Sequence, residues 1–265
     1  MSLRRWILVV SAALGVAVVG TVAYAVWPRR ATPFTEEEAV ADFRGRPENI
    51  ASSDGAAGER EVPAEGVYVF SATGGEDVKL GPLPAQSRPY PDVVPVVVVH
   101  TEPGCFTVTL NLLDQHTEDT TYCTDGAESL RLDTHVKHQE VGALSPTATM
   151  TCDPSRLLGP DAPAHDLHCR LVLSGGPVDL TADVDGVARS SRPVVTQVGG
   201  ADIDAVRLDS SYGISGDLDG TWEESLWLRA SDLLPLRIER DLDLEGLATF
   251  EEHSTLVLSD LEPAT

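Results

Sequence analysis

The sequence predicts a mainly β protein whose central element is a curved antiparallel sheet, shaped as a half-barrel or a sandwich. From Gly66 onward, apolar and polar residues alternate with a period of two, and helical periodicity is hard to find. Strands with one apolar and one polar face are typical of an antiparallel sheet with one side in water. Turn signals separate these strands: Gly74-Gly75, Asp125-Gly126, Gly175-Gly176, Asp185-Gly186, Gly199-Gly200 and Asp219-Gly220.

Before the sheet, the sequence predicts one transmembrane helix over residues 6–28. Between Arg5 and Arg29 there is no charged residue, and a 22-residue helix is about 33 Å long, enough to cross a bilayer. A short basic tail favours the cytoplasmic side. We therefore expect residues 1–5 in the cytoplasm and the chain after Pro28 outside it, as a single-pass protein of the cell membrane.

The competing interpretation of this segment is a signal peptide that is removed. Ala23-Tyr24-Ala25 fits a small-x-small cleavage site after Ala25, and the basic start of the chain fits a signal peptide too. The apolar segment is longer than the roughly 7–15 residues that such peptides commonly have. We therefore favour an uncleaved anchor, whose partner is the lipid bilayer.

The charge of the chain excludes one class of partner. Four of its 19 basic residues lie in the first 30 positions, so the remaining 235 residues carry 15 basic and 42 acidic residues, a net charge of −27. A polyanion of this kind repels nucleic acid and anionic lipid head groups. Hydrophobic residues make up 42% of the chain, too many for a disordered protein.

Residues 29–65 are expected to form a linker that contains one short helix near 36–44. Thr35 followed by Glu38 is a capping box, which marks the start of a helix, and Gly45 ends the apolar stripe. The sequence then becomes rich in Gly, Ala, Ser, Glu and Pro without periodicity, as flexible linkers are.

Residues 66–263 are expected to form one extracytoplasmic antiparallel β domain, because no break in composition divides them. Val93–Val99 is nearly all valine, so both faces of this strand should be covered, and Pro95 favours a sheet edge or a bulge. Other strands are marked by apolar residues of one parity: Phe106, Val108, Leu110 and Leu112; Leu130, Leu132 and Val136; Trp222, Leu226 and Leu228; Leu236, Ile238, Leu242 and Leu244; Phe250, Leu256 and Leu258.

The four cysteines are expected to form two disulfides between sequence neighbours, Cys105 with Cys123 and Cys152 with Cys169. Of the three possible connectivities, this one closes loops of 18 and 17 residues, each worth about 3 kcal/mol in the chain-entropy model. Such disulfides indicate an oxidising compartment. The alternative is a metal site that adds His165 and His168 to the second pair, but the spacings that zinc sites use are missing.

No catalytic, cofactor-binding or metal site is expected. Ser215 lies in an incomplete Gly-x-Ser-x-Gly motif, and phosphate-binding glycine loops are absent. His135 and His138 are three residues apart, so they should lie on opposite faces of a strand. The clusters Asp183-x-Asp185 and Asp217-x-Asp219 suggest calcium, but a glycine directly after the second aspartate does not fit an EF-hand.

Two sets of residues resemble known families. The first set is similar to the ectodomain of actinobacterial single-pass membrane proteins of unknown function: Gly66–Glu76, Tyr90-Pro91, Gly104-Cys105 and Thr149–Asp153. The second set, Trp227 with Leu234–Arg237, resembles the closing part of lipoprotein-carrier-like half-barrel domains. That resemblance implies a strongly curved sheet that cups an acyl chain or a lipoprotein, and it transfers no site residue.

Three functions follow as hypotheses. A non-catalytic binding module for a lipid or envelope component predicts more apolar area inside the sheet than a filled core needs. A structural or protein-interaction component of the cell envelope predicts a filled core and an exposed patch. A hydrolase acting in the envelope predicts acids or histidines with shifted pKa values in a cleft. We favour the first, with a lipid or an envelope protein as partner and without a cofactor.

The sequence does not decide which element covers the apolar face of the sheet. A second sheet layer, the loop over residues 153–166, the helix near 36–44 or a ligand would each serve.

Overall fold

The computed structural model describes residues 31–46, 62–82, 84–124, 129–142, 144–176 and 178–265. The predicted tail over residues 1–5 and the predicted span over 6–28 lie outside these residues. Within the described part, every helix is too short or too polar to cross a membrane.

One helix and fourteen strands make up the described structure. They are α2 (Glu36–Gly45), β1 (Gly66–Leu80), β2 (Gln86–Pro89), β3 (Val93–Glu102), β4 (Cys105–Leu113), β5 (His116–Cys123), β6 (Leu130–Gln139), β7 (Thr147–Cys152), β8 (Arg156–Leu158), β9 (Ala164–Ser174), β10 (Leu180–Val198), β11 (Ala201–Gly216), β12 (Asp219–Arg229), β13 (Pro235–Glu245) and β14 (Ala248–Leu258).

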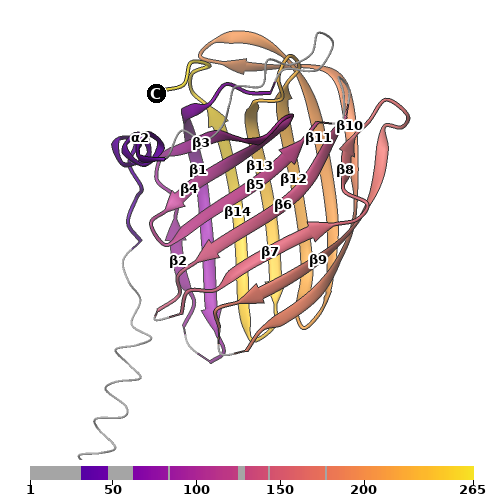
Figure 1. Ribbon diagram of the computed structural model, residues 1–265. Helices are drawn as coiled ribbons and strands as arrows, with labels where there is room; N and C mark the ends of the chain where they lie inside the picture. Colours follow the sequence, from indigo (N-terminus) through magenta and orange to yellow (C-terminus); the bar gives the residue numbers. More distant parts are fainter. Residues whose placement is uncertain (1–30, 47–61, 83, 125–128, 143, 177) are drawn as a thin grey trace, which may run out of the picture.

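Twelve of the strands form a closed antiparallel barrel (Figure 1). The ring closes where β1 pairs with β14, from Phe70 opposite Leu258 to Leu80 opposite Ala248. Outside the ring, β2 pairs with β1 and β8 pairs with β6. The mainly β, antiparallel class is confirmed, but the expected half-barrel or sandwich is corrected to a closed barrel. Closure joins the first strand to the last, and such a distant pairing leaves no local signal in a sequence.

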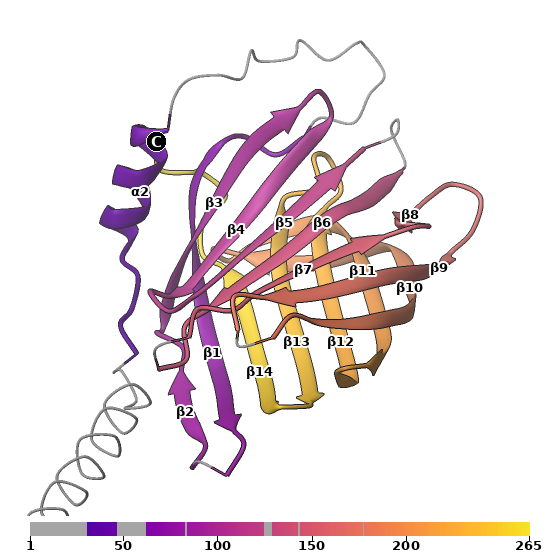
Figure 2. The ribbon, with the colours of Figure 1, turned by 60° about the horizontal axis from the view of Figure 1, so that its bottom comes forward.

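The two walls of the barrel cover each other's apolar faces. In Figures 1 and 2, β3 to β9 form one wall, which crosses the strands β10 to β14 of the other. Inward side chains of both walls belong to one continuous core. The segment over residues 153–166, expected as an irregular loop, contains strand β8 and the start of β9 instead. Leu157 and Leu158 of β8 belong to the core, so this segment covers part of the barrel as well.

Helix α2 confirms the short helix predicted near residues 36–44. Its capping box is present: the Glu38 amide donates to Thr35 Oγ1 at 3.3 Å, and the Thr35 amide donates to Glu38 Oε2 at 2.9 Å. Ala39 packs against Val67 and Val97 on the outside of β1 and β3. Part of the predicted linker is therefore fixed to the barrel.

Strand β3 is covered on both faces, as expected from its valines. Val96 is buried in the barrel core, and Val97 lies under α2. The strand is not at an edge, because it pairs with β1 and β4. Pro95 lies one residue beyond the first pair of the β4 ladder, Val96 opposite Leu110, so its missing N–H removes no bond of that ladder.

Glycine signals that predict turns lie inside strands at three places, one of them Asp219-Gly220 at the start of β12. Gly74 is in β1 with φ +104°, and a Cβ there would lie 2.0 Å from the carbonyl oxygen of His253. Gly186 is in β10, where a Cβ would lie 2.4 Å from the ring of Tyr212. Both positions need glycine for a close approach, which looks the same as a turn in the sequence. Gly199-Gly200 does form the predicted turn between β10 and β11.

Both disulfides have the predicted connectivity. Cys105–Cys123 joins β4 to β5, and Cys152–Cys169 joins β7 to β9, each between residues directly opposite in the sheet. The alternative metal site is excluded, because the sulfurs of Cys152 and Cys169 are bonded to each other.

We expect each disulfide to add about 3 kcal/mol to the free energy of unfolding, because each restricts the unfolded chain through a loop of similar length. The double variants Cys105→Ser/Cys123→Ser and Cys152→Ser/Cys169→Ser should each lose this amount in urea unfolding. In a control variant in which all four cysteines are replaced by serine, reducing agent should not change the urea unfolding midpoint. An unaltered unfolding midpoint in either double variant would contradict the prediction.

Candidate functional site

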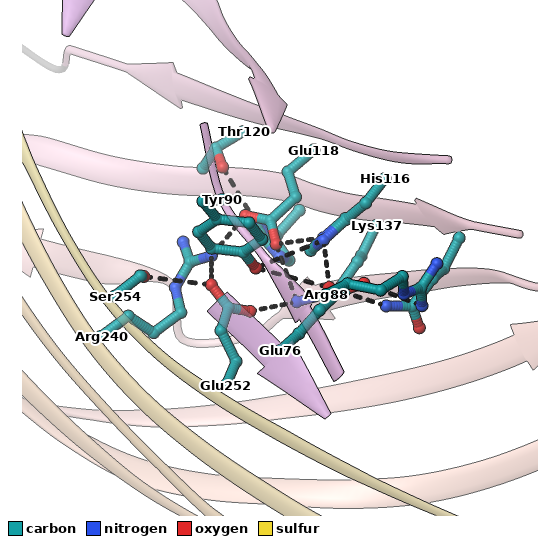
Figure 3. Close-up of polar contacts among 12 residues, drawn as sticks. Glu76, Arg88, Tyr90, His116, Glu118, Thr120, Lys137, Arg240, Glu252 and Ser254 are labelled. Carbon is teal, nitrogen blue, oxygen red and sulfur yellow. Dashed lines mark hydrogen bonds and ion pairs between the residues drawn. The ribbon is translucent and has the colours of Figure 1, made fainter. Parts of the chain in front are cut away.

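Eight charged side chains meet inside the barrel and form what we call the interior ion network, and all of them except Glu224 are labelled in Figure 3. All are at least 85% buried by side-chain accessibility, which is unusual for charged groups. The members are Glu76 of β1, Arg88 of β2, His116 and Glu118 of β5, Lys137 of β6, Glu224 of β12, Arg240 of β13 and Glu252 of β14.

Sequence analysis missed this network, although the strand patterns contain a signal for it. Glu224, Arg240 and Glu252 each occupy a gap in a predicted apolar series of one parity. Glu224 lies between Trp222 and Leu226, and all three side chains face the barrel interior. A charged residue at an apolar position of a strand is the pattern that could have revealed the site.

The inward position of Lys137 does not follow from the parity of its strand, because the register of β6 shifts. The pairing between β5 and β6 shifts by one residue after Leu132, as at a β-bulge. Beyond the shift, His135 and Lys137 take the inward positions, because a one-residue slip exchanges the faces of a strand. Val136, predicted on the apolar face with Leu132, is therefore on the opposite face. His135 and His138 do lie on opposite faces, as expected.

Glu118 is the centre of the network. Its carboxylate is 2.8 Å from Lys137 Nζ, 2.5 Å from Arg240 Nη1 and 2.9 Å from His116 Nε2. Glu252 shares two of these cations, at 2.5 Å from Lys137 Nζ and 3.3 Å from Arg240 Nη1. Charge-assisted bonds of this geometry hold both carboxylates in fixed positions.

The outer members of the network are paired in the same way. Glu76 is 2.5 Å from His116 Nδ1 and 2.8 Å from Arg88 Nη2. Glu224 is 2.7 Å from Arg240 Nη2. Since a carboxylate only accepts, the two bonds of His116 require protons on both ring nitrogens. The imidazolium then balances the network at four positive and four negative charges.

The pKa values of the carboxylates depend on these partners. Burial raises the pKa of Glu118, but Arg240, Lys137 and His116 together outweigh it and hold that pKa well below the usual value. Glu252 has a lowered pKa for the same reasons. Glu224 differs, because burial outweighs its bond to Arg240 and raises its pKa.

The two buried histidines have opposite shifts. Burial and the charge of Lys137 lower the pKa of His116, but Glu76 and Glu118 outweigh both and raise it overall. Burial lowers the pKa of His135 to about 4. His135 bonds Thr120 Oγ1 at 2.9 Å, and burial outweighs the charge of Glu118, which favours the charged form of the ring.

Neither metal binding nor catalysis fits this geometry. His116, Glu118 and Glu252 each offer an atom within 4.8 Å of the others, as a metal site would. Lys137 Nζ already lies between the two carboxylates, so a metal ion would have to displace it. All three side chains are 0% exposed, and a substrate could not reach them.

An apolar pocket opens at the end of the barrel where β1 ends and β14 begins. We call this cavity of about 120 Å³ the mouth pocket. Both walls contribute to its lining: Val78, Leu80, Lys137, Gln139, Val141, Leu144, Pro146, Ala148, Leu171, Leu173, Leu218, Leu244, Ala248 and Phe250. Leu80, Leu144 and Leu173 are partly exposed, so the pocket has a rim in contact with water.

A larger depression of about 620 Å³ lies on the outer face of β10 to β14 and β1. It is polar, and several of its charged groups are paired: Arg207 with Asp209 at 2.7 Å, and His253 with Asp241 at 3.2 Å. Glu224 and Arg240 of the interior ion network also line it. Trp227 lies beside it on the outer face, 4.7 Å from the guanidinium of Arg207. This arrangement is typical of the solvated face of a sheet.

The acidic clusters considered for calcium do not converge. Asp185 pairs with His168 at 2.6 Å, and Asp217 accepts from the amide of Thr181 at 2.9 Å.

No family model matches the chain, and no match is found among the curated proteins or the solved structures.

We expect Lys137→Met to lower the free energy of unfolding by about 3–5 kcal/mol, because it leaves two buried carboxylates short of a cation. Arg156→Met is the matched control: it removes an exposed partner of Asp161, 3.2 Å away, and should cost less than about 1 kcal/mol. Glu252→Gln should restore part of the loss in Lys137→Met. Equal costs for the two single variants would refute a structural role of the network.

Stability should pass through a maximum near neutral pH. Because the pKa of His135 falls from 6.5 to about 4 on folding, the protein should lose about 3 kcal/mol as the pH falls from 6.5 to 4. The raised pKa of His116 acts oppositely: its contribution is present below pH 6.5 and is lost as the pH rises through the folded value.

Urea unfolding between pH 4 and 9 measures both effects. His135→Gln should remove most of the decline between pH 6.5 and 4, and His116→Gln should remove the decline on the alkaline side. The same pH profile in wild type and His135→Gln would contradict the assignment of the acidic limb.

Proposed function

We propose that the protein is a non-catalytic binding module that holds the apolar end of a lipid-type molecule in the mouth pocket. The observation that carries this proposal is the lining of the pocket, which is apolar except for Lys137 and Gln139. A concave apolar site with a few polar groups is the usual form of a small-molecule site.

The size of the pocket limits the ligand. An apolar cavity of about 150 Å³ admits one benzene-sized molecule. The mouth pocket, at about 120 Å³ and open at its rim, has room for a small ring or the end of one chain. The rest of the barrel interior is filled by side chains, so we propose that a larger lipid would leave most of its length outside.

Two observations favour binding over the other hypotheses. The most exposed large apolar side chains are on different elements, which does not favour an apolar protein-interaction patch: Val93, Val172, Val178, Val195 and Leu247. His116, Glu118 and Glu252, whose pKa values are shifted, are fully buried rather than placed in a cleft, which does not favour a hydrolase.

The proposed place of the barrel is outside the cytoplasm, on a chain anchored through residues 6–28. The two disulfides support an oxidising compartment. A lipid or another apolar molecule of the envelope would then reach the pocket from the membrane side. The resemblance to half-barrel carrier domains is consistent with such a ligand.

Ala148 allows a direct test, because it lines the mouth pocket and the cavity behind it. Benzene should bind saturably, raise the melting temperature and shift methyl NMR signals of Leu171 and Leu244. Ala148→Phe should fill the pocket and abolish these effects. Thr149→Phe is the matched control, since Thr149 is on the opposite face of β7 and should leave binding unchanged. Without saturable benzene binding to the wild type, the proposed function fails.

A further inference from the structure

The mouth pocket continues into the barrel through two smaller cavities. The first inner cavity, of about 50 Å³, shares Lys137, Ala148, Leu171 and Leu244 with the mouth pocket. The second, of about 10 Å³, lies next to it, and Trp222 and His135 line both. A ligand whose apolar part occupies the mouth pocket would therefore direct its other end toward these side chains.

The polar groups of the first inner cavity are mostly hydrogen-bond donors, whereas the carboxylate of Glu224 lines the second. His135, Lys137, Trp222 and Arg240 line the first inner cavity, and no carboxylate lines it. Lys, Trp and Arg side chains donate and cannot accept. Trp222 is 8% exposed, and its indole Nε1–H has no acceptor among the residues that the structure describes. A buried donor without a partner costs free energy, so an acceptor brought by a ligand would be favoured there.

The two cations at this end are already committed to carboxylates. Lys137 Nζ is within 2.8 Å of both Glu118 and Glu252, and Arg240 contacts these two acids and Glu224. An added carboxylate near Lys137 would face two other carboxylates at close range, and it would lose its hydration. An added ammonium in the first inner cavity would meet two cations and a further donor, Trp222. Both ions are thus disfavoured, while an uncharged acceptor is not.

We propose that the pocket selects an uncharged amphiphile, with its apolar part in the mouth pocket and one acceptor oxygen, of an alcohol, ester or amide, bound by the indole N–H of Trp222. This inference rests on the proposed function and adds the chemical class of the ligand. Trp222 is a specificity-determining residue in this arrangement.

The test compares three probes with the same six-carbon chain: 1-hexanol, hexanoate and hexylammonium, titrated into the wild-type protein at pH 7.5 and followed by NMR. We expect 1-hexanol to bind at least tenfold more tightly than either ion. The signal of the Trp222 indole N–H should shift with 1-hexanol and move much less with benzene, which lacks the acceptor oxygen.

Trp222→Phe should weaken 1-hexanol binding about three- to tenfold, the loss of one neutral hydrogen bond, and leave benzene binding unchanged. Trp227→Phe, on the outer face, should change neither. Hexanoate or hexylammonium bound as tightly as 1-hexanol would overturn the proposed selectivity. An unchanged 1-hexanol affinity in Trp222→Phe would overturn the assignment of the acceptor oxygen to the indole N–H. In both cases benzene binding would still support the proposed function, which fails separately if benzene does not bind saturably.

Discussion

Two carboxylates face each other across the seam that closes the barrel, and the rest of the structure depends on the cations that neutralise their charge. Glu76 of β1 is directly opposite Glu252 of β14. Like charges in such a pair repel. The cations that separate them, His116 and Lys137, come from β5 and β6 in the opposite wall. The seam is therefore stable only when both walls are in register, so the network ties closure of the ring to the packing of its interior.

The same compensation divides the interior into two regions with different roles. Around Glu118 every acid has its cation, and this part of the barrel is rigid, buried and polar. Toward the mouth the walls are apolar and incompletely filled. Lys137 belongs to both regions, since it bonds two carboxylates and lines the pocket. The ion network at the inner end of the apolar pocket limits how deep a ligand can enter and which polar group it can carry.

Local sequence patterns predicted much of the fold, because they depend on neighbouring residues. The capping box of Thr35, the disulfide partners and the parity of strands such as β4 and β13 are of this kind. Closure, the register shift after Leu132 and the role of Gly186 depend on residues far apart in the chain. The candidate site combines both kinds of information. A charge at an apolar position, as at Arg240 and Glu252, is a local signal, but the partners of these charges on β5 and β6 are far away in the chain.

The contact of Thr32 with the barrel limits how far the barrel can lie from the proposed membrane span. The Asp114 amide donates to the carbonyl of Thr32 at 2.9 Å, and neighbouring Gln115 bonds Glu140, next to the rim of the mouth pocket. With the proposed span ending at Pro28, only three residues lie between the bilayer and this attachment, and the four steps from Pro28 to Thr32 cover at most about 14 Å of extended chain. The tether is thus far too short for the barrel to diffuse freely above the membrane. It would keep the pocket at the lipid surface, where an apolar molecule could exchange without a long passage through water.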